Sequence, residues 1–527
     1  MISFSERTLM LFVLLQSLCL AKTSNAVESP SDFRCLYYKL QTSIEPEQRS
    51  LRAETFLTLV CLVPKVDTIE FSLNENFPIQ QISLNNIEPL SVDRRMTNDG
   101  ESFYKLVSRI TYVSGDTLVL SISYSGSLNA TLEFGVISPQ ITELSGYINW
   151  FPYLSATDYS ETKTDLSVTL PSKYEFTSNG FLVSDDRVGL TKTKCWHNEN
   201  EFQFDFVIVA SDSMKLQQVS PHRFIFYSTE TERQQLIKMI TFSSECIYYY
   251  TTLYGPSKLK KDITIVSLPR NRPSTNAYYR STLMVFLKSY LETDGGSWQF
   301  NKNLFHEIAH FFWIVTSSVR PPDSWIDEGL AEYSAWLAVD KIYGKDYFNK
   351  CLERATNIIL KKPQVFLTHS AQDDYFYAFV PYIYHMLRFD LGDSLFLKML
   401  KQLHPTIGTM GNLSAQAFVD TIQKFTPTNM DTFFDQWFSR NTFPILAYSW
   451  QQDSLEMSKV ILKITQRQSQ LFCTSVSVLL KFNSGDTEIR KVYINDRVTK
   501  TIISTNARVE DVEINEDKSI IAAVIRE

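Results

Sequence analysis

The spacing of apolar residues changes twice along this chain, and these two changes constrain its fold more than any other feature. Up to about residue 215, apolar and polar residues alternate in short runs such as Leu118–Tyr124, with Gly, Asn and Asp between the runs. From 216 to 445 the apolar residues recur at helical spacing, and from 446 the alternation returns. No single period continues through the 527 residues. We therefore expect a multidomain α+β protein.

The first and last regions are expected to form β-sandwiches. In residues 27–215, strand-like runs include Phe56–Val63 and Phe202–Ala210, and turn signals include Asn98-Asp99-Gly100. Many short strands separated by turn residues are typical of an antiparallel sandwich. Residues 446–527 repeat this pattern on a smaller scale and predict a small C-terminal β-sandwich. Its strand-like runs are Val460–Ile464, Ser475–Phe482 and Glu488–Ile494.

The middle region, residues 216–445, is predicted to be an α-rich domain with a small sheet. Helical spacing extends over 230–253, 302–317, 326–342, 344–360, 376–390, 393–403, 413–424 and 430–438. Two short apolar runs, Ile263–Leu268 and Leu283–Leu287, lie between the first two of these segments and predict strands. The length of the chain suits about three domains.

The N-terminus has the pattern of a secretory signal. Arg7 precedes an apolar run from Leu9 to Ala21, and Ser24-Asn25-Ala26 places small residues where a signal peptidase cleaves. We interpret residues 1–26 as a signal peptide and expect a secreted or extracytoplasmic protein. An uncleaved anchor is disfavoured because a membrane helix needs about 20 apolar residues. Since no later segment has 18 consecutive apolar residues, the mature chain is expected to lack a membrane span.

Charge and cysteine content narrow the possible partners. The net charge is -7 and no block of Lys or Arg occurs, which argues against nucleic acid as a partner. Six cysteines follow the signal and lack Cys-x-x-Cys spacing, so a cysteine zinc site is disfavoured. Cys35 and Cys61 lie in successive predicted strands, and their pairing is open, as is the oligomeric state. Sequons at Asn129 and Asn412 fit exposed loops.

The segment His306-Glu307-Ile308-Ala309-His310 is the strongest chemical signal in the sequence. Residues four apart lie on one face of a helix, so the two imidazoles can reach one metal ion. Two neutral histidines bind zinc, and the adjacent Glu307 can take a proton from zinc-bound water. The alternative is a buried amphipathic helix whose two histidines are satisfied by ordinary hydrogen bonds.

A third ligand distinguishes these interpretations. The segment Trp325–Tyr333 follows a break at Pro321 and Pro322, so a second helix can return antiparallel to the first. Glu328 would then face the histidine pair and complete a two-His, one-Glu catalytic zinc site. Glu332, one turn further on, is a candidate to orient a ligand imidazole from behind, although an exposed surface charge fits equally well.

These residues resemble a known family. His306-Glu307-x-x-His310 followed by Trp325-Ile326-Asp327-Glu328-Gly329 is similar to the gluzincins, specifically the aminopeptidase N-like family. The resemblance extends over nearly the whole mature chain. Weaker matches are Tyr38-Lys39-Leu40, Phe151-Pro152, Phe434-Asp435-Gln436-Trp437 and Phe443-Pro444. It implies an N-terminal sandwich to residue 215, a thermolysin-like zinc domain over 216–445 and a small closing sandwich, without the long helical domain found in many members.

The resemblance also implies catalytic roles. One Zn²⁺ would be held by His306, His310 and Glu328, with Glu307 as general base. The family stabilises its oxyanion with a tyrosine that lies a short way before a Met-Leu pair, and Met386-Leu387 places Tyr377 at that position. Three neighbouring tyrosines are alternatives for this role: Tyr375, Tyr382 and Tyr384.

The chain departs from the family pattern in two places. Seventeen residues, 311–327, separate His310 from Glu328, whereas members usually have eighteen. The Gly-x-Met-Glu-Asn motif, whose glutamate holds the substrate amine, is missing, since Pro273–Leu283 contains no carboxylate. Gln140 is one place removed from the position of the family glutamine that assists this glutamate.

The resulting hypothesis is a secreted zinc metallopeptidase that acts on peptide or protein substrates, with its exopeptidase specificity in doubt. An endopeptidase, or a peptidase with unusual end recognition, is one alternative. A non-catalytic secreted binding protein that retains the fold is the other.

Overall fold

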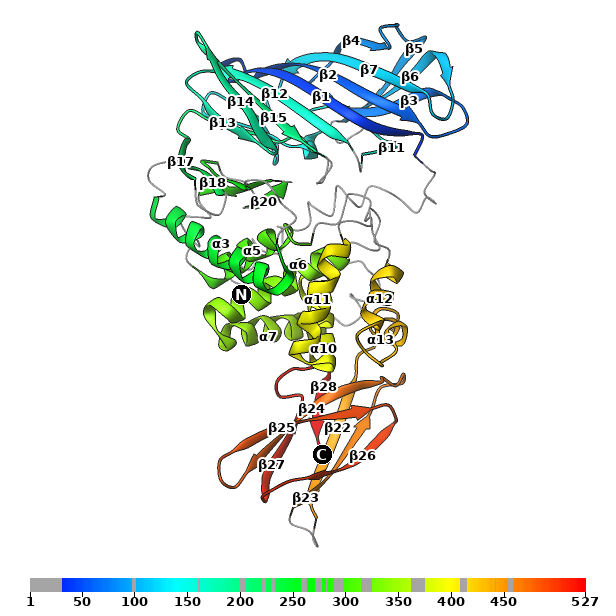
Figure 1. Cartoon of the computed structure of the whole chain (residues 1–527), viewed down its shortest axis with the longest axis vertical. Helices are drawn as coiled ribbons and strands as arrows, with labels where there is room; N and C mark the ends of the chain where they lie inside the picture. Colours follow the sequence, from blue (N-terminus) through cyan, green and yellow to red (C-terminus); the bar gives the residue numbers. More distant parts are fainter. Residues whose placement is uncertain are drawn as a thin grey trace. The chain divides into compact units, whose positions relative to one another are not determined.

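The structure is a computed structural model of mixed α and β architecture with several separate sheets (Figure 1). It describes residues 31–527 except 97–100, 160–161, 200–204, 220–223, 229–232, 257–262, 271–276, 281, 289–296, 314–324, 362–374, 408–414, 441 and 454–457. The predicted signal at 1–26, the sequon at Asn412 and the turn at 98–100 lie outside the described residues. Two compact units form: the first runs to Ser244 and includes Lys258–Asn301, and the second comprises Glu245–Ser257, Lys302–Val315 and Pro321–Glu527.

The largest sheet of the first unit has eight strands. These are β1 (Phe33–Glu45), β2 (Ser50–Cys61), β4 (Ile79–Leu84), β7 (Thr117–Ser127), β11 (Thr157–Asp158), β12 (Lys163–Pro171), β14 (Phe181–Val188) and β15 (Thr191–Asn198). Their order is β14-β15-β12-β1-β2-β7-β4, with β11 beside β1. The expectation of a purely antiparallel sandwich is wrong here, because β1 pairs in parallel with both β11 and β12. The chain passes through other sheets after β7 and returns beside β1 in the same direction.

Two four-stranded sheets complete the sandwich region. One has the order β10-β3-β6-β5 and the other β13-β16-β9-β8. Their strands are β3 (Val66–Asn74), β5 (Ser91–Met96), β6 (Glu101–Tyr112), β8 (Gly135–Ile137), β9 (Ile141–Leu144), β10 (Tyr153–Leu154), β13 (Glu175–Ser178) and β16 (Ile208–Ser211). Tyr38 of the large sheet, Phe71 of β3 and Leu144 of β9 belong to one buried core. The alternating apolar residues of the three sheets therefore face one another, which explains the period of two in the sequence.

A five-stranded sheet in the first unit has the order β17-β18-β19-β21-β20. Its strands are β17 (Lys215–Val219), β18 (Phe224–Ser228), β19 (Ile263–Leu268), β20 (Ala277–Arg280) and β21 (Leu283–Leu287). The observed bounds of β19 and β21 coincide with the two predicted apolar runs. Every residue of these two strands is buried, and β18, β19 and β21 are parallel. Strands that are buried on both faces read as continuous apolar runs.

The helices have bounds close to those predicted, with two exceptions. They are α3 (Arg233–Tyr254), α5 (Trp298–Ala309), α6 (Trp325–Tyr343), α7 (Lys345–Lys361), α10 (Val380–Leu391), α11 (Asp393–Ile407), α12 (Ala415–Gln423) and α13 (Met430–Phe438). The predicted helix over 302–317 instead begins at Trp298 and ends at Ala309. The predicted helix over 376–390 is divided into a π-helical turn, η4 (Tyr375–Phe379), and α10. Pro381 lies at the start of α10 and has no N–H to continue an α-helical ladder from the preceding residues.

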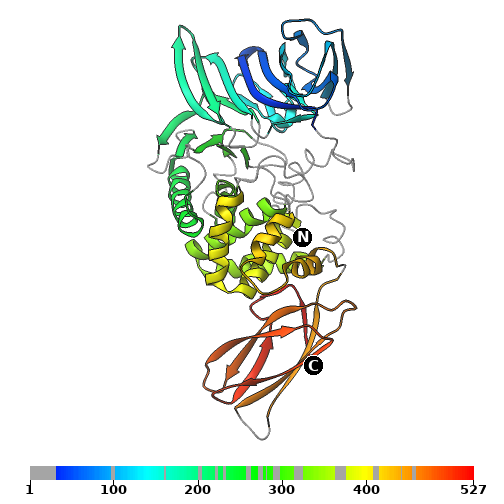
Figure 2. The same cartoon turned by 45° about the vertical axis from the view of Figure 1, so that its right-hand side comes forward.

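The second unit ends in two small sheets, coloured orange to red in Figure 2. Their orders are β26-β23-β22-β28 and β25-β24-β27. The strands are β22 (Ile445–Gln452), β23 (Lys459–Gln466), β24 (Thr474–Phe482), β25 (Thr487–Ile494), β26 (Val498–Ser504), β27 (Val509–Ile514) and β28 (Ala523–Arg526). The Gln436 side chain of α13 both donates to the carbonyl and accepts from the N–H of Cys473. This strand region is therefore attached to the helices.

Three further sequence features have clear positions. Cys35 and Cys61 are buried thiols and are not bonded to each other. Asn129 of the first sequon lies exposed after β7. No helix within the described part of the chain is both long and apolar enough to cross a membrane.

Candidate metal centre

The first ligand helix, α5, begins at a capping serine. The Oγ of Ser297 accepts a hydrogen bond from the N–H of Phe300 at 3.1 Å, which satisfies a free donor in the first turn. His306 lies in the last turn, and His310 follows the helix end. The N–H of His310 still donates to the carbonyl of His306 at 3.3 Å. The backbone therefore retains the helical spacing that brings the two imidazoles to one side.

The second ligand helix, α6, is buried along almost its whole length from Gly329 to Val339. A Cβ added to Gly329 would lie 2.2 Å from Cγ1 of Val380 and 2.9 Å from a ring carbon of Tyr384. Helix α10 therefore approaches α6 directly beside the predicted ligand Glu328, and only glycine leaves room for this contact. The burial of α6 explains why its sequence lacks a clear polar face.

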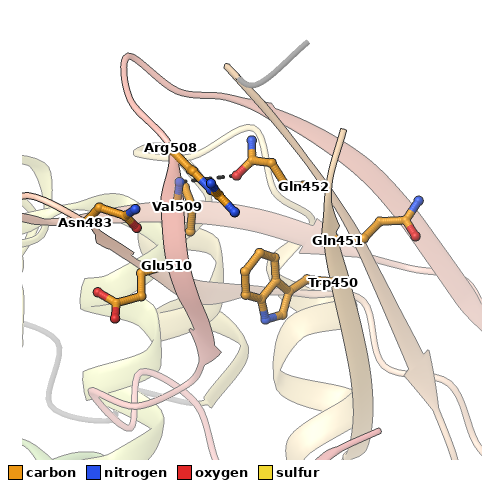
Figure 3. A pocket seen from close by; sticks show the side chains of 7 residues that line it. All are labelled: Trp450, Gln451, Gln452, Asn483, Arg508, Val509 and Glu510. Carbon is orange, nitrogen blue, oxygen red and sulfur yellow. Dashed lines mark hydrogen bonds between the residues drawn. The ribbon is translucent and has the colours of Figure 1, made fainter. Parts of the chain in front are cut away.

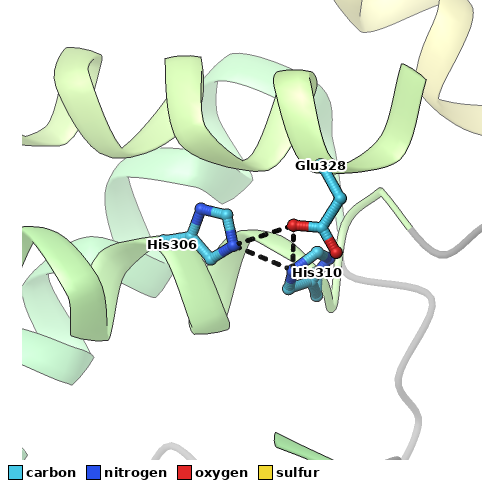
Figure 4. A group of neighbouring side chains, drawn as sticks. All are labelled: His306, His310 and Glu328. Atoms are coloured by element: carbon cyan, nitrogen blue, oxygen red, sulfur yellow. Dashed lines mark hydrogen bonds and ion pairs between the residues drawn. The ribbon is translucent and has the colours of Figure 1, made fainter. Parts of the chain in front are cut away.

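His306, His310 and Glu328 come together as predicted (Figure 4). The Nε2 atoms of the two histidines are 3.1 Å apart. Oε2 of Glu328 lies 3.4 Å from Nε2 of His306 and 3.8 Å from Nε2 of His310. Tetrahedral zinc with ligand bonds near 2.0–2.1 Å separates its ligand atoms by about 3.4 Å. The three donors thus fit one zinc ion. Within the described ranges, these three side chains form the group of histidine and carboxylate residues that could hold a metal.

The predicted general base and oxyanion partner lie next to these ligands. Glu307 follows His306 on α5 and is 5% exposed. The hydroxyl of Tyr377 donates to Oε2 of Glu328 at 3.0 Å, and its ring centre lies 5.3 Å from that of His306. Of the competing tyrosines, Tyr382 donates to the carbonyl of Lys518 and Tyr384 to that of Ile326. The side chain of Tyr375 is outside the described set. The structure therefore brings Tyr377 to the ligands.

Glu332 is not a surface charge, because it is 2% exposed and lies behind His306. Its Oε2 is 3.0 Å from Nδ1 of His306. Its Oε1 accepts from Nε1 of Trp336 at 2.9 Å and from Nζ of Lys302. Since Lys302 and His306 contact Glu332 while His310 approaches Glu328, the two helices run antiparallel, as expected. The sequence interpretation did not identify Lys302 and Trp336, although each lies four residues from a predicted site residue.

The site is arranged to hold a positive charge between its carboxylates. Burial opposes protonation of His306, but hydrogen bonds to Glu328 and Glu332 outweigh this and raise its pKa to about 10. Burial lowers the pKa of His310 to about 4. Burial disfavours the ionised form of Glu332, yet Lys302 and His306 lower its pKa to about 2. A divalent cation here would displace the proton of His306 and take over its charge.

Tyr377 remains protonated at neutral pH. Burial raises the pKa of its phenol well above the ordinary value, and the charge of Glu328 acts in the same direction. The hydroxyl is therefore a hydrogen-bond donor, which is the form that an oxyanion requires.

Strand β20, in the segment that lacks the amine-binding motif, lies at the edge of the five-stranded sheet. Within the first unit, Tyr278 of β20 donates to Oε1 of Glu143 at 3.0 Å, and Arg270 pairs with the same carboxylate. Arg280 pairs with Asp205 at 3.0 Å. Gln140, which the sequence placed one position from the family glutamine, is exposed, whereas Glu143 is fully buried. Polar side chains of β20 therefore contact two buried carboxylates of the first unit, those of Glu143 and Asp205.

One open pocket of about 650 Å³ lies in the C-terminal strand region (Figure 3). It is lined by Trp450, Gln451, Gln452, Asn483, Arg508, Val509 and Glu510. These residues include no histidine or cysteine and only one carboxylate. The pocket therefore lacks the donors of a metal centre.

Comparisons with known proteins indicate the fold. No family model and no curated protein matches the sequence. Among solved structures, the crystal structure of Legionella pneumophila aminopeptidase A in complex with aspartic acid matches with a TM-score of 0.73 at 14% identity. The match covers 96% of this chain and 61% of that chain, so this chain spans about three fifths of the aminopeptidase. The protein thus has a fold found in a peptidase.

Proposed function

We propose that this protein is a secreted, zinc-dependent metallopeptidase of the aminopeptidase N-like gluzincin type, with a thermolysin-like catalytic domain. The main support is the convergence of His306, His310 and Glu328, whose ligand atoms all lie within 4.8 Å of one another. The peptidase-like fold agrees with this proposal. Secretion rests on the predicted signal at residues 1–26.

Nε2 of His306, Nε2 of His310 and a carboxylate oxygen of Glu328 would hold a single Zn²⁺. When bound, zinc would supply Lewis acidity and bring the pKa of a water ligand towards about 7. Glu307 takes the proton from the attacking water and passes it to the leaving amine. Tyr377 donates its hydroxyl proton in a hydrogen bond to the developing oxyanion. Each role belongs to a residue that is at least partly shielded from solvent.

We propose that the protein cleaves peptide bonds, and we do not assign it specificity for free N-termini. Residues 273–283 contain no carboxylate to bind a free amine, and Tyr278 and Arg280 are engaged with acids of the first unit. We therefore expect blocked N-termini to be accepted.

The test is turnover of a peptide library by the purified full chain, read by mass spectrometry. Each peptide is supplied with a free and with an acetylated N-terminus, before and after treatment with a chelator. We expect one zinc per chain, cleavage of both forms, and loss of activity that added zinc restores. Zinc binding without turnover of any peptide would contradict the proposal and favour a binding protein. Cleavage restricted to free N-termini would restore the aminopeptidase assignment.

A further inference from the structure

Two helical rows of side chains face each other at the metal centre, and each row extends beyond the proposed ligands. On α5 and the turn after it, Lys302, His306 and His310 are spaced by four residues. On α6, Glu328, Glu332 and Trp336 have the same spacing. Residues four apart share a face of a helix. Lys302 and Trp336 therefore occupy the next turn behind the ligands, on opposite helices.

Lys302 and Trp336 donate hydrogen bonds to the same carboxylate oxygen of Glu332. Nζ of Lys302 and Nε1 of Trp336 donate to Oε1 of Glu332. The other oxygen, Oε2, is left to face Nδ1 of His306 at 3.0 Å. A carboxylate held in this way accepts a hydrogen bond from the Nδ1–H of the imidazole, and Nε2 is then the nitrogen with a lone pair for the metal.

We propose that Lys302 is a positioning residue of the zinc centre, acting through Glu332 to orient His306, with Trp336 as the second support. The inference rests on the proposed function. Lys302 also provides a charge that Glu332 needs, since the side chains of Lys302 and Glu332 are only 15% and 2% exposed. A carboxylate buried to this degree requires a paired cation. Lys302 balances the charge of Glu332, so this carboxylate can orient His306 without itself requiring the charge of the metal.

The test compares Lys302→Met with Lys302→Arg, which keeps the charge, and with Lys341→Met, which removes an exposed lysine at the end of α6. Zinc affinity is measured by competition with a chelating dye, and the Co²⁺-substituted proteins are compared by their visible spectra. We expect Lys302→Met to bind zinc about 10–100-fold more weakly and to have an altered cobalt spectrum. Lys302→Arg should recover most of the affinity, and Lys341→Met should match the wild type.

A second variant covers the case in which Lys302→Met does not fold. Trp336→Phe keeps a buried aromatic ring and removes the Nε1 donor with the smaller ring of the indole, so we expect a smaller loss of zinc affinity in a folded protein. Wild-type zinc affinity in Lys302→Met, or in Trp336→Phe when the first variant is unfolded, would overturn the positioning role alone. Failure of the wild type to bind zinc would overturn the proposed function together with this role.

Discussion

The hydroxyl of Tyr377 and the carboxylate of Glu328 share a hydrogen bond of 3.0 Å, and the oxygen involved is the one that lies 3.4 Å from Nε2 of His306. The proposed oxyanion donor is therefore held by the proposed third ligand. In the proposed reaction the phenol would exchange this carboxylate oxygen for the oxyanion as its hydrogen-bond acceptor. This hydrogen bond links η4 to α6.

Replacement of Tyr377 by phenylalanine is expected to lower kcat by about 10²–10³-fold, the usual effect of removing one oxyanion donor. Zinc content should remain at the wild-type level, because the ligands are intact. Steady-state kinetics with metal analysis provides the measurement. Tyr382→Phe is the matched control, since its hydroxyl donates to the carbonyl of Lys518. Equal activity of both variants would exclude Tyr377 from the reaction.

Glu307→Gln is expected to reduce kcat by about 10²–10⁴-fold, the range that a general base contributes. The amide cannot accept the proton of water, but its volume fits the same buried site, so zinc stoichiometry should not change. Glu353→Gln, on the exposed surface of α7, serves as the control. Full activity in Glu307→Gln would show that another group is the base.

The partly buried His385 is expected to make the stability of the chelator-treated protein depend on pH. Burial, with Arg388 and Lys345 in support, lowers its pKa to about 3. Because the unfolded state takes up its proton near pH 6.5, this residue leaves stability unchanged above that pH and reduces it as the pH falls to about 3. The full loss is about 4–5 kcal/mol, from 1.36 kcal/mol per pH unit.

His385→Gln removes this titration while keeping a polar group near Tyr333. The fall in Tm between pH 7 and pH 4 should therefore be smaller in the variant than in the wild type. Thermal unfolding followed by circular dichroism at several pH values provides the comparison. Parallel pH profiles of the two proteins would show that His385 is not held neutral in the folded protein.

Two ion pairs of the first unit should differ sharply in their effect on stability. Glu143→Gln leaves Arg270 buried without its charge partner and is expected to cost about 3–5 kcal/mol. Glu47, which pairs with Lys173 on the exposed surface, is the control, and Glu47→Gln should leave the unfolding midpoint unchanged. Urea unfolding followed by tryptophan fluorescence measures both. Similar midpoints for the two variants would mean that the Glu143 pair is solvated.

Gly329→Ala tests the close packing of α6 against α10, because the substitution should destabilise a tightly packed helix and stabilise an exposed one. In an exposed helix interior this change stabilises by up to about 1 kcal/mol. Here the added methyl group would lie 2.2 Å from Val380, so we expect a loss of about 1–3 kcal/mol and weaker zinc binding through the adjacent Glu328. Thermal unfolding and zinc titration report the two effects. A rise in Tm would disprove the close contact.

Local patterns predicted the parts of the fold that depend on neighbouring residues. The bounds of β19 and β21 followed from continuous apolar runs between polar segments, and those of α13 followed from helical spacing over 430–438. The division of 376–390 at Pro381 was missed because the apolar period continues through it. The parallel pairing of β1 with β12 was also missed, since it joins segments more than 100 residues apart in the chain.

The sequence by itself predicted two of the proposed metal ligands, because four-residue spacing on a helix places His306 and His310 on one face whatever surrounds them. It also restricted the third ligand to the next helix. Only the tertiary structure decided which of the described candidate tyrosines reaches Glu328, that Glu332 lies behind His306, and that Lys302 and Trp336 hold its carboxylate. These contacts depend on how α5, α6 and α10 pack against one another. Packing joins segments that are distant in the sequence, so local sequence periodicity does not predict it.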